Sequence, residues 1–123
     1  MDYRTQLGNQ AEETVAQQLQ REGFTILERN YRKQDGEIDL IARKDSLIVF
    51  VEVKMRQQNY FDLGHVITPS KQRKIILVAK KYLSTVGWHE YVYRFDVALL
   101  YKKDNILSID YIPNAFNQSC VTW

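Results

Sequence analysis

The chain has 123 residues, of which 45% are hydrophobic and 26% charged, a length and composition typical of one folded domain. They exclude a disordered or collagen-like chain, and Cys120, the one cysteine of the sequence, excludes a disulfide framework. The net charge of +2 favours no class of partner, and no apolar run reaches the roughly 20 residues of a membrane span, so a single domain over residues 1–123 without membrane contact is expected.

The amino-terminal half is predicted to form one helix and three strands. Its first residues, MDYRTQLGNQ, do not resemble a signal peptide, so we expect a cytoplasmic protein. Apolar periodicity predicts a helix over residues 3–22. Residues 24–32 are typical of a strand, and the β-rich runs 37–43 and 47–55 are typical of a hairpin.

The carboxyl-terminal half is predicted to form a loop, a second helix and two more strands. Residues 56–67 lack periodicity, which is typical of a loop. Thr68 and Pro69 combine a capping hydroxyl with a first-turn proline, so a helix is predicted from there to about residue 85. Residues 91–101 and 106–112 are typical of strands. The order αβββαββ predicts an α/β fold in which helices flank a mixed β-sheet.

Positive charge is concentrated in one part of the sequence. Residues 63–89 contain no acid and five basic residues, which are Lys71, Arg73, Lys74, Lys80 and Lys81. One-sided basic segments of this kind suit a phosphate backbone, and a solvated helix face is the alternative interpretation.

The two strands of the predicted hairpin carry charged side chains among apolar ones. Because alternate residues of a strand share a face, Asp39 is expected on the face opposite to that of Ile38 and Leu40. In the second strand, Glu52 and Lys54 are expected to share a face. Acidic groups so placed in buried-looking strands are candidates for a functional site.

A two-residue turn at positions 45–46 would fix the register of this hairpin. It places Asp39 directly opposite Glu52 and, further along, Glu37 opposite Lys54. Two opposed carboxylates among apolar neighbours repel each other, and a hard divalent cation with oxygen ligands would compensate them. The alternative is an ordinary ion pair between Glu37 and Lys54, with one carboxylate protonated or facing water. Glu37 is a further site candidate, as the partner of Lys54 or as a ligand of a second ion.

Glu12 is expected on the packing face of the first helix. At 100° per residue, Gly8, Val15, Ala16 and Leu19 all lie within about 60° of it. A glutamate on a packing face is costly unless it is paired or near a cation, so Glu12 is predicted to approach the same site. The alternative is that its side chain reaches out to solvent past Gly8.

Asp39, thirteen positions before the first residue of Glu52-Val53-Lys54, resembles the D…ExK core of the PD-(D/E)xK nuclease superfamily. Over nearly its whole length the chain also resembles the YraN family (UPF0102), which is related to Holliday-junction resolvase-like endonucleases. The segments that carry this resemblance are Gly8…Ala11-Glu12, Arg29-Asn30-Tyr31-Arg32, residues 36–41, residues 50–54, Arg56, Lys71 and Arg94-Phe95-Asp96-Val97. Departures are Phe61-Asp62, where the family usually has Phe-Gly, and Ala11, where glycine is common.

The resemblance implies a restriction-endonuclease-like sheet and a nuclease that uses Mg²⁺ or Mn²⁺ to hydrolyse phosphodiester bonds of DNA, branched DNA included. It implies that Asp39 and Glu52 hold the metal together with the Val53 carbonyl. Glu12 would complete the site, directly or through a metal-bound water. Lys54 would orient or help to deprotonate the attacking water and would offset charge in the transition state.

The predicted contacts with the DNA backbone come from the basic residues Arg56, Lys71, Arg73 and Lys74. Lys71 falls in the first turn of the second helix, where a cation opposes the helix dipole. It is therefore predicted either to share a bound phosphate with the free N–H groups of that turn or to be a plain solvated lysine.

The main alternative to an enzyme is a catalytically inactive module of the same fold that binds nucleic acid or a protein partner. A third interpretation is a scaffold in which the charges form a cluster of ion pairs. The complete set of Glu12, Asp39, Glu52 and Lys54 favours the enzyme, because a chain freed from catalysis has no need to keep these residues together. Resolvase-like relatives are two-fold dimers, so a homodimer is an expectation by analogy.

Overall fold

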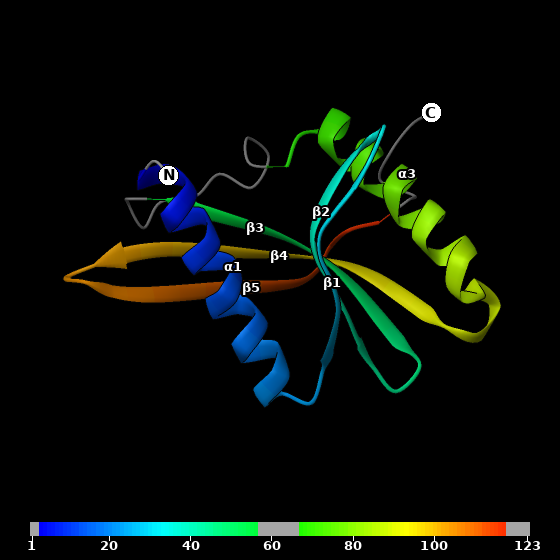
Figure 1. Cartoon of the computed structure of the whole chain (residues 1–123), viewed down its shortest axis with the longest axis horizontal. Coiled ribbons are helices and arrows are strands. Elements are labelled where there is room, and N and C mark those ends of the chain that lie inside the picture. The colour runs from blue at the N-terminus through cyan, green and yellow to red at the C-terminus, as the bar shows by residue number, and fades with distance from the viewer. Residues whose placement is uncertain (1–2, 57–66, 118–123) are drawn as a thin grey trace.

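The computed structural model describes residues 3–56 and 67–117, and these form a five-stranded sheet with a helix on each face (Figure 1). The elements are α1 (Tyr3–Arg21), β1 (Thr25–Lys33), β2 (Gly36–Lys44), β3 (Leu47–Arg56), α3 (Pro69–Val86), the 3₁₀ turn η1 (Trp88–Glu90), β4 (Val92–Lys103) and β5 (Ile106–Phe116). This confirms the predicted order αβββαββ, to which the structure adds the short turn η1. Most of the predicted loop, residues 57–66, lies outside the described residues.

The sheet is mixed, as predicted, with the strand order β1-β2-β3-β4-β5. Strands β3 and β4 are parallel, whereas every other neighbouring pair is antiparallel. Two parallel strands need a crossover connection, and α3 provides it by packing against one face of the sheet. The start of α3 therefore follows the carboxyl end of β3 in the chain.

Two apolar cores hold the layers together. Residues of α3 such as Ile76 and Val78 pack with one set of sheet residues, and residues of α1 such as Val15 and Leu19 pack with the other set. Figure 1 accordingly shows α1 and α3 on opposite sides of the strands. Within the described ranges, neither helix combines the length and the apolar character needed to cross a membrane.

The ends of α3 follow the signals of the sequence. Thr68 caps the helix, since its Oγ1 accepts a hydrogen bond from the Lys71 backbone N–H at 3.2 Å, and Pro69 is the first helical residue. At the other end Gly87 has a φ of 81°, the left-handed conformation that glycine adopts without strain. The cap fixes the residue at which α3 begins and so fixes which lysines lie in its first turns.

The β2–β3 hairpin has the predicted register wherever the two strands pair. The pairs run from Lys44↔Leu47 to Leu40↔Val51. The ladder ends there, one residue short of Asp39, although β2 stays paired with β1 down to Gly36. Strands β2 and β3 therefore diverge at the point where the acidic residues begin.

The alternation predicted for β2 is wrong at Ile38. Ile38 packs in the core of α3, whereas Leu40 and Ala42 pack in the core of α1. The change falls at Asp39, and Asn30, which lies opposite it between two paired residues of β1, has a left-handed φ of 52°. A left-handed residue bends a strand, so the β1–β2 hairpin curls toward α3 beyond this point.

The tip of this hairpin is fastened to α3. Asp35 forms an ion pair with Lys81. Gly36 lies so near the helix that a Cβ there would be 3.4 Å from the Cβ of Lys74. The hairpin tip thus forms a wall that spans from the sheet to the helix.

Strand β5 continues to Phe116 and does not end at residue 112 as predicted. Pairing with β4 is interrupted after Val97↔Ile112 and resumes at Phe95↔Phe116, so Pro113, which has no N–H to donate, falls in the bulge between them. The residue of β4 opposite this bulge is Asp96, which is 0% exposed.

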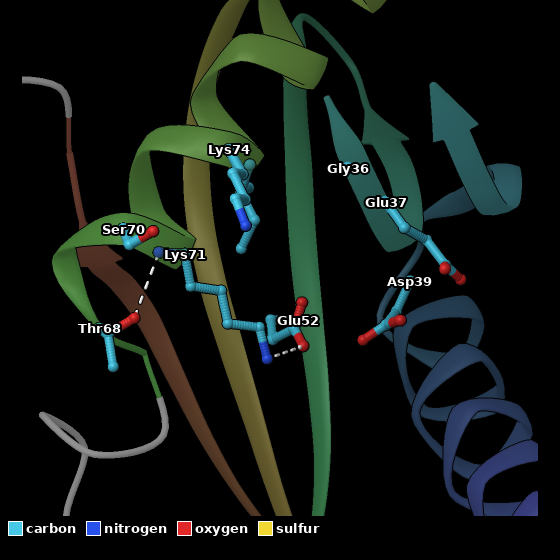
Figure 2. A pocket seen from close by; sticks show the side chains of 9 residues that line it. Gly36, Glu37, Asp39, Glu52, Thr68, Ser70, Lys71 and Lys74 are labelled. Carbon is cyan, nitrogen blue, oxygen red and sulfur yellow. Dashed lines mark hydrogen bonds and ion pairs between the residues drawn. The ribbon is translucent and has the colours of Figure 1, made fainter. Parts of the chain in front are cut away.

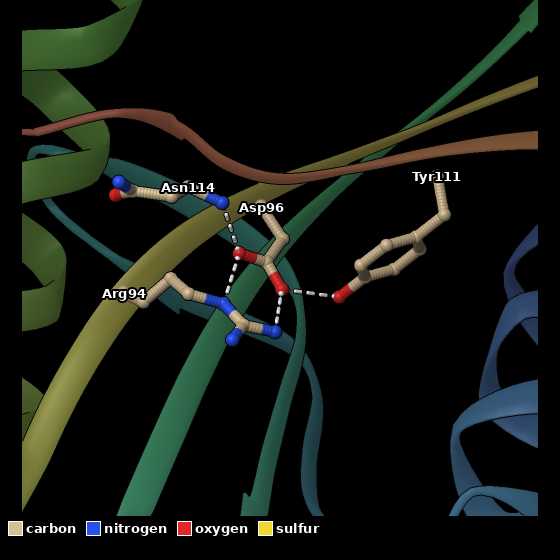
Figure 3. A network of polar contacts seen from close by, with 4 residues as sticks. All are labelled: Arg94, Asp96, Tyr111 and Asn114. Carbon is tan, nitrogen blue, oxygen red and sulfur yellow. Dashed lines mark hydrogen bonds and ion pairs between the residues drawn. The ribbon is translucent and has the colours of Figure 1, made fainter.

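Asp96 is the centre of a buried polar network (Figure 3). Its carboxylate accepts hydrogen bonds from Arg94 Nε at 2.8 Å and Nη2 at 3.0 Å, from the Tyr111 hydroxyl at 2.5 Å and from the Asn114 backbone N–H at 2.9 Å. The bond to Asp96 raises the pKa of Arg94, and burial followed by the bond to Asp96 raises the pKa of Tyr111. One carboxylate therefore accepts hydrogen bonds from residues of both β4 and β5, including the backbone N–H of Asn114 in the bulge.

Candidate functional site

Where β2 and β3 diverge, they enclose a cavity of about 460 Å³ together with the start of α3 (Figure 2). The lining residues are Gly36, Glu37 and Asp39 of β2, Glu52 of β3, the cap Thr68, and Ser70, Lys71, Lys74 and Ile75 of α3. Three acidic residues and two lysines thus line the opening of the sheet.

Asp39 and Glu52 point toward each other across the cavity (Figure 2). Asp39 Oδ2 accepts a hydrogen bond from the Val53 backbone N–H at 2.8 Å, so a side chain replaces the strand partner that a continued ladder would supply. Burial, followed by the negative charge of Glu52, raises the pKa of Asp39 to about 8. Without a compensating cation, the neutral acid form of Asp39 is therefore favoured up to a higher pH than in an exposed aspartate.

The Glu52 carboxylate is paired with Lys71 of α3. Lys71 Nζ lies 3.0 Å from Glu52 Oε1, and the Glu52 side chain is 11% exposed against 37% for that of Lys71. The two alternatives predicted for Lys71 were a bound phosphate and free solvent. Neither of them includes this contact with Glu52. The ion pair arises because the first turn of α3 and the face of β3 that bears Glu52 line the same cavity.

Among the described residues Glu37 is not paired with Lys54, which was one of the two roles predicted for it, and its role as a ligand of a second ion stays a prediction. Glu37 Oε2 instead accepts a hydrogen bond from Arg32 Nη2 of the neighbouring strand β1 at 2.9 Å, and its carboxylate points away from Glu52 in Figure 2. The divergence of β2 from β3 separates the two predicted partners. Lys54 follows Glu52 on β3 by alternation and is half-buried, but it does not line the cavity.

Glu12 lies on α1, half-buried at the border of the packing face. Burial is the main cause that raises its pKa, and the negative charges of Glu37 and Glu52 add to the effect. A hydrogen bond with the Asn30 side chain lowers it in turn. Glu12 is thus within electrostatic range of the carboxylate pair, although it does not line the cavity.

Asn30 is a residue that sequence reasoning did not single out as part of the site. It bends β1 opposite Asp39 and holds the Glu12 carboxylate with its side chain. The available signal was local, because asparagine adopts the left-handed conformation more readily than most residues. An asparagine inside an otherwise β-rich run therefore marks a bend.

Asp39 and Glu52 supply carboxylate oxygens, the class of ligand that hard divalent ions prefer. Within residues 3–56 and 67–117, no group of three or more His, Cys, Asp or Glu side chains lies close enough to hold a metal ion, which leaves Asp39 and Glu52 as the facing pair. Two carboxylates with water in the remaining positions are the ligands that Mg²⁺ and Mn²⁺ accept. Val53 enters the site through its N–H, and the role predicted for its carbonyl stays a prediction.

Of the four residues predicted to contact DNA, Lys71 and Lys74 line the cavity. Arg56, the last residue of β3, and Arg73 of α3 are half-buried and lie outside it. Their contacts with nucleic acid stay a prediction.

The Asp39→Asn variant is expected to remove a pH dependence of stability. Because the pKa of Asp39 is raised from 3.8 to about 8, the folded protein retains a proton that the unfolded chain releases between these values. From this group, the free energy of unfolding falls as the pH rises through that window, by at most about 1.4 kcal/mol per pH unit. Asparagine keeps the acceptor for the Val53 N–H and does not ionise, so the variant should be the more stable protein at the upper end of the window.

Urea unfolding of both proteins in EDTA across the window between pH 4 and 8 measures this difference, which should shrink toward the acidic end. A variant that is no more stable than the wild type at the alkaline end would contradict the assigned protonation of Asp39.

Comparison with known proteins places the chain in a family. The family model described as "Uncharacterised protein family UPF0102" matches residues 11–100. A UPF0102 protein of Desulforapulum autotrophicum is 40% identical over 118 residues, which cover 94% of this chain and 96% of the relative. UPF0102 proteins of Vibrio parahaemolyticus and Nitrosomonas europaea are 41% and 42% identical, over 92% and 91% of this chain and 93% and 94% of the relatives.

Proposed function

The chain belongs to the uncharacterised protein family UPF0102, and we propose that it is a nuclease that uses Mg²⁺ or Mn²⁺ to hydrolyse phosphodiester bonds of DNA. The observation that carries the proposal is the pair Asp39 and Glu52, which face each other across a cavity at the divergence of two strands. The Asp…Glu-Val-Lys spacing of the sequence supplies the same two carboxylates, which follow the last β2–β3 pair Leu40↔Val51, with Lys54 two positions after Glu52.

The chemistry assigns a role to each residue. Hydrolysis forms a bond between a water oxygen and phosphorus and breaks the bond between phosphorus and the leaving oxygen. A bound divalent ion supplies charge neutralisation and a more acidic water. Asp39 and Glu52 would hold that ion, and Lys54 would orient the attacking water or take part in its deprotonation. Glu12 would complete the site from its edge, directly or through water.

The basic side chains that line the cavity support a polyanionic substrate. Lys71 and Lys74 lie on the side of the cavity formed by α3, and Arg56 and Arg73 extend the positive charge along β3 and α3. Phosphate contacts of this type position a nucleic acid without reading its sequence. We therefore place DNA across the cavity, with branched DNA as the first form to test and a homodimer as the form of the enzyme to test alongside it.

Incubation of the protein with branched, flapped and single-stranded DNA tests the proposal. Cleavage is expected in Mn²⁺, and it should be absent in EDTA and in the Asp39→Ala variant. Cleavage that persists in this variant would come from a contaminating nuclease and would remove the assignment.

The second candidate is a catalytically inactive module that binds nucleic acid. The observation that favours it is the ion pair of Lys71 with Glu52, which already neutralises one of the two carboxylates. Binding of DNA without cleavage of any of the three substrates, in Mg²⁺ and in Mn²⁺, would favour this module over the enzyme.

A further inference from the structure

The ion pair of Lys71 and Glu52 joins a largely buried carboxylate to a more exposed ammonium group. The Glu52 side chain is only 11% exposed, so water alone solvates its carboxylate poorly, and a positive charge must stand beside it. The Lys71 side chain is 37% exposed and ends a long flexible stem, so its ammonium group can move into water at low cost.

Nothing in the position of Lys71 within α3 explains why its side chain lies in the cavity. It lies in the first turn of the helix, where the dipole disfavours a positive charge, and its backbone N–H is already taken by the Thr68 cap. Among the described residues, Glu52 is the only carboxylate paired with the Lys71 ammonium group. The carboxylate, and not the helix, therefore holds this lysine in the cavity.

A divalent ion and an ammonium group compete for the same carboxylate. A metal ion sits about 2 Å from a carboxylate oxygen and brings two positive charges to it. An ammonium group 3.0 Å from the same oxygen would then be repelled at short range in a partly buried cavity. Each cation therefore weakens the contact of the other with Glu52.

Building on the metal site of the proposed function, we propose that Lys71 is the exchangeable counter-ion of Glu52. Its ammonium group neutralises Glu52 in the metal-free protein, and binding of the divalent ion displaces it into the cavity. The displaced group then points to the space where a substrate phosphate would lie. Lys71 is thus a positioning residue for Glu52 before the ion binds and a phosphate ligand afterwards.

Lys74 provides a matched control. It is one turn further along α3, lines the same cavity and is exposed, yet it forms no ion pair with any carboxylate among the described residues. Replacing either lysine with methionine removes one positive charge from the same cavity and keeps most of the apolar stem. The two variants therefore differ in the direct contact with Glu52.

Titration of Mn²⁺ into the metal-free full-length chain by calorimetry tests the exchange. Lys71→Met is expected to bind Mn²⁺ about tenfold more tightly than the wild type, because no cation has to be displaced. Lys74→Met should change the affinity by no more than about twofold to threefold. Glu52→Gln should lose most of the affinity. If Lys71→Met does not fold, Lys71→Gln, which keeps a hydrogen-bond donor near Glu52, serves in its place.

The possible failures are distinct. If the wild type binds Mn²⁺ and Lys71→Met gains no more affinity than Lys74→Met, the exchange is overturned and the metal site stands. If none of the proteins binds Mn²⁺, Lys71→Met included, both the proposed metal-dependent function and the exchange are overturned. Binding to Lys71→Met alone would support the exchange in its strongest form.

Discussion

Asp96→Ala is expected to destabilise the fold by about 2–4 kcal/mol, because truncation of the buried carboxylate leaves its hydrogen-bond donors without an acceptor. The carboxylate is 0% exposed and accepts hydrogen bonds from Arg94, Tyr111 and Asn114. Without it, the guanidinium group of Arg94 loses both of its bonds to Asp96, and the Asn114 N–H that closes the β5 bulge loses its acceptor.

Equilibrium unfolding in urea of the wild type, Asp96→Ala and Asp110→Ala measures this effect. Asp110 lies on β5 of the same hairpin but is exposed, so its removal should change the free energy of unfolding by no more than about 0.5 kcal/mol. Similar small effects for both variants would show that the network adds little to stability.

Lys54→Met is expected to slow Mn²⁺-dependent DNA cleavage by a factor of about 10² to 10⁴, the range typical of a lost general acid–base group. Lys54 lies on the same face of β3 as Glu52 by alternation, but it is not one of the two proposed metal ligands. The variant should therefore bind Mn²⁺ with an affinity within about twofold to threefold of the wild type, although it cleaves DNA much more slowly.

Single-turnover cleavage and calorimetric titration, made on the same preparation, separate these two quantities. Lys103→Met, which removes an exposed lysine at the end of the adjacent strand β4, is the control for a general loss of positive charge. Equal cleavage by Lys54→Met and Lys103→Met would exclude Lys54 from the reaction.

The register of the β2–β3 hairpin was predictable from local rules as far as Leu40↔Val51, the last pair before Asp39 and Glu52. A two-residue turn at positions 45–46 fixes the pairing of Lys44 with Leu47, and a strand period of two then carries the register along the hairpin. The cap of α3 was equally local, since a threonine followed by a proline marks a helix start. These signals predicted the elements, and they carried the correct register to within one residue of Asp39 and Glu52.

The end of the β2–β3 ladder was not predictable in the same way. Register arithmetic continues indefinitely, whereas the strands part after Leu40↔Val51 because the hairpin of β1 and β2 curls onto α3. That curl depends on tertiary contacts such as the packing of Ile38, which no local pattern encodes. The predicted pairing of Glu37 with Lys54 was wrong for this reason.

Contacts between distant segments account for the other omissions. Asp96 joins β4 to a bulge eighteen residues further along the chain, and Lys71 reaches Glu52 across a crossover. The sequence singles out Lys71 and Asp96, but it does not show which distant residue each of them contacts. Only the sheet order brings its partner near.

The walls of the cavity form a closed ring of contacts. The ladder joins β3 to β2, the hairpin tip is fastened to α3 by Asp35 and Lys81, and Lys71 joins α3 back to Glu52 on β3. Each wall of the cavity is joined to the next, so the opening cannot widen unless one of the two ion pairs breaks. Because salt screens both half-exposed lysines, higher ionic strength should loosen the ring even as it weakens the attraction of a polyanion. Higher ionic strength is therefore expected to open the cavity and also to weaken its attraction for a polyanion. Binding of the polyanion should be strongest at an intermediate ionic strength.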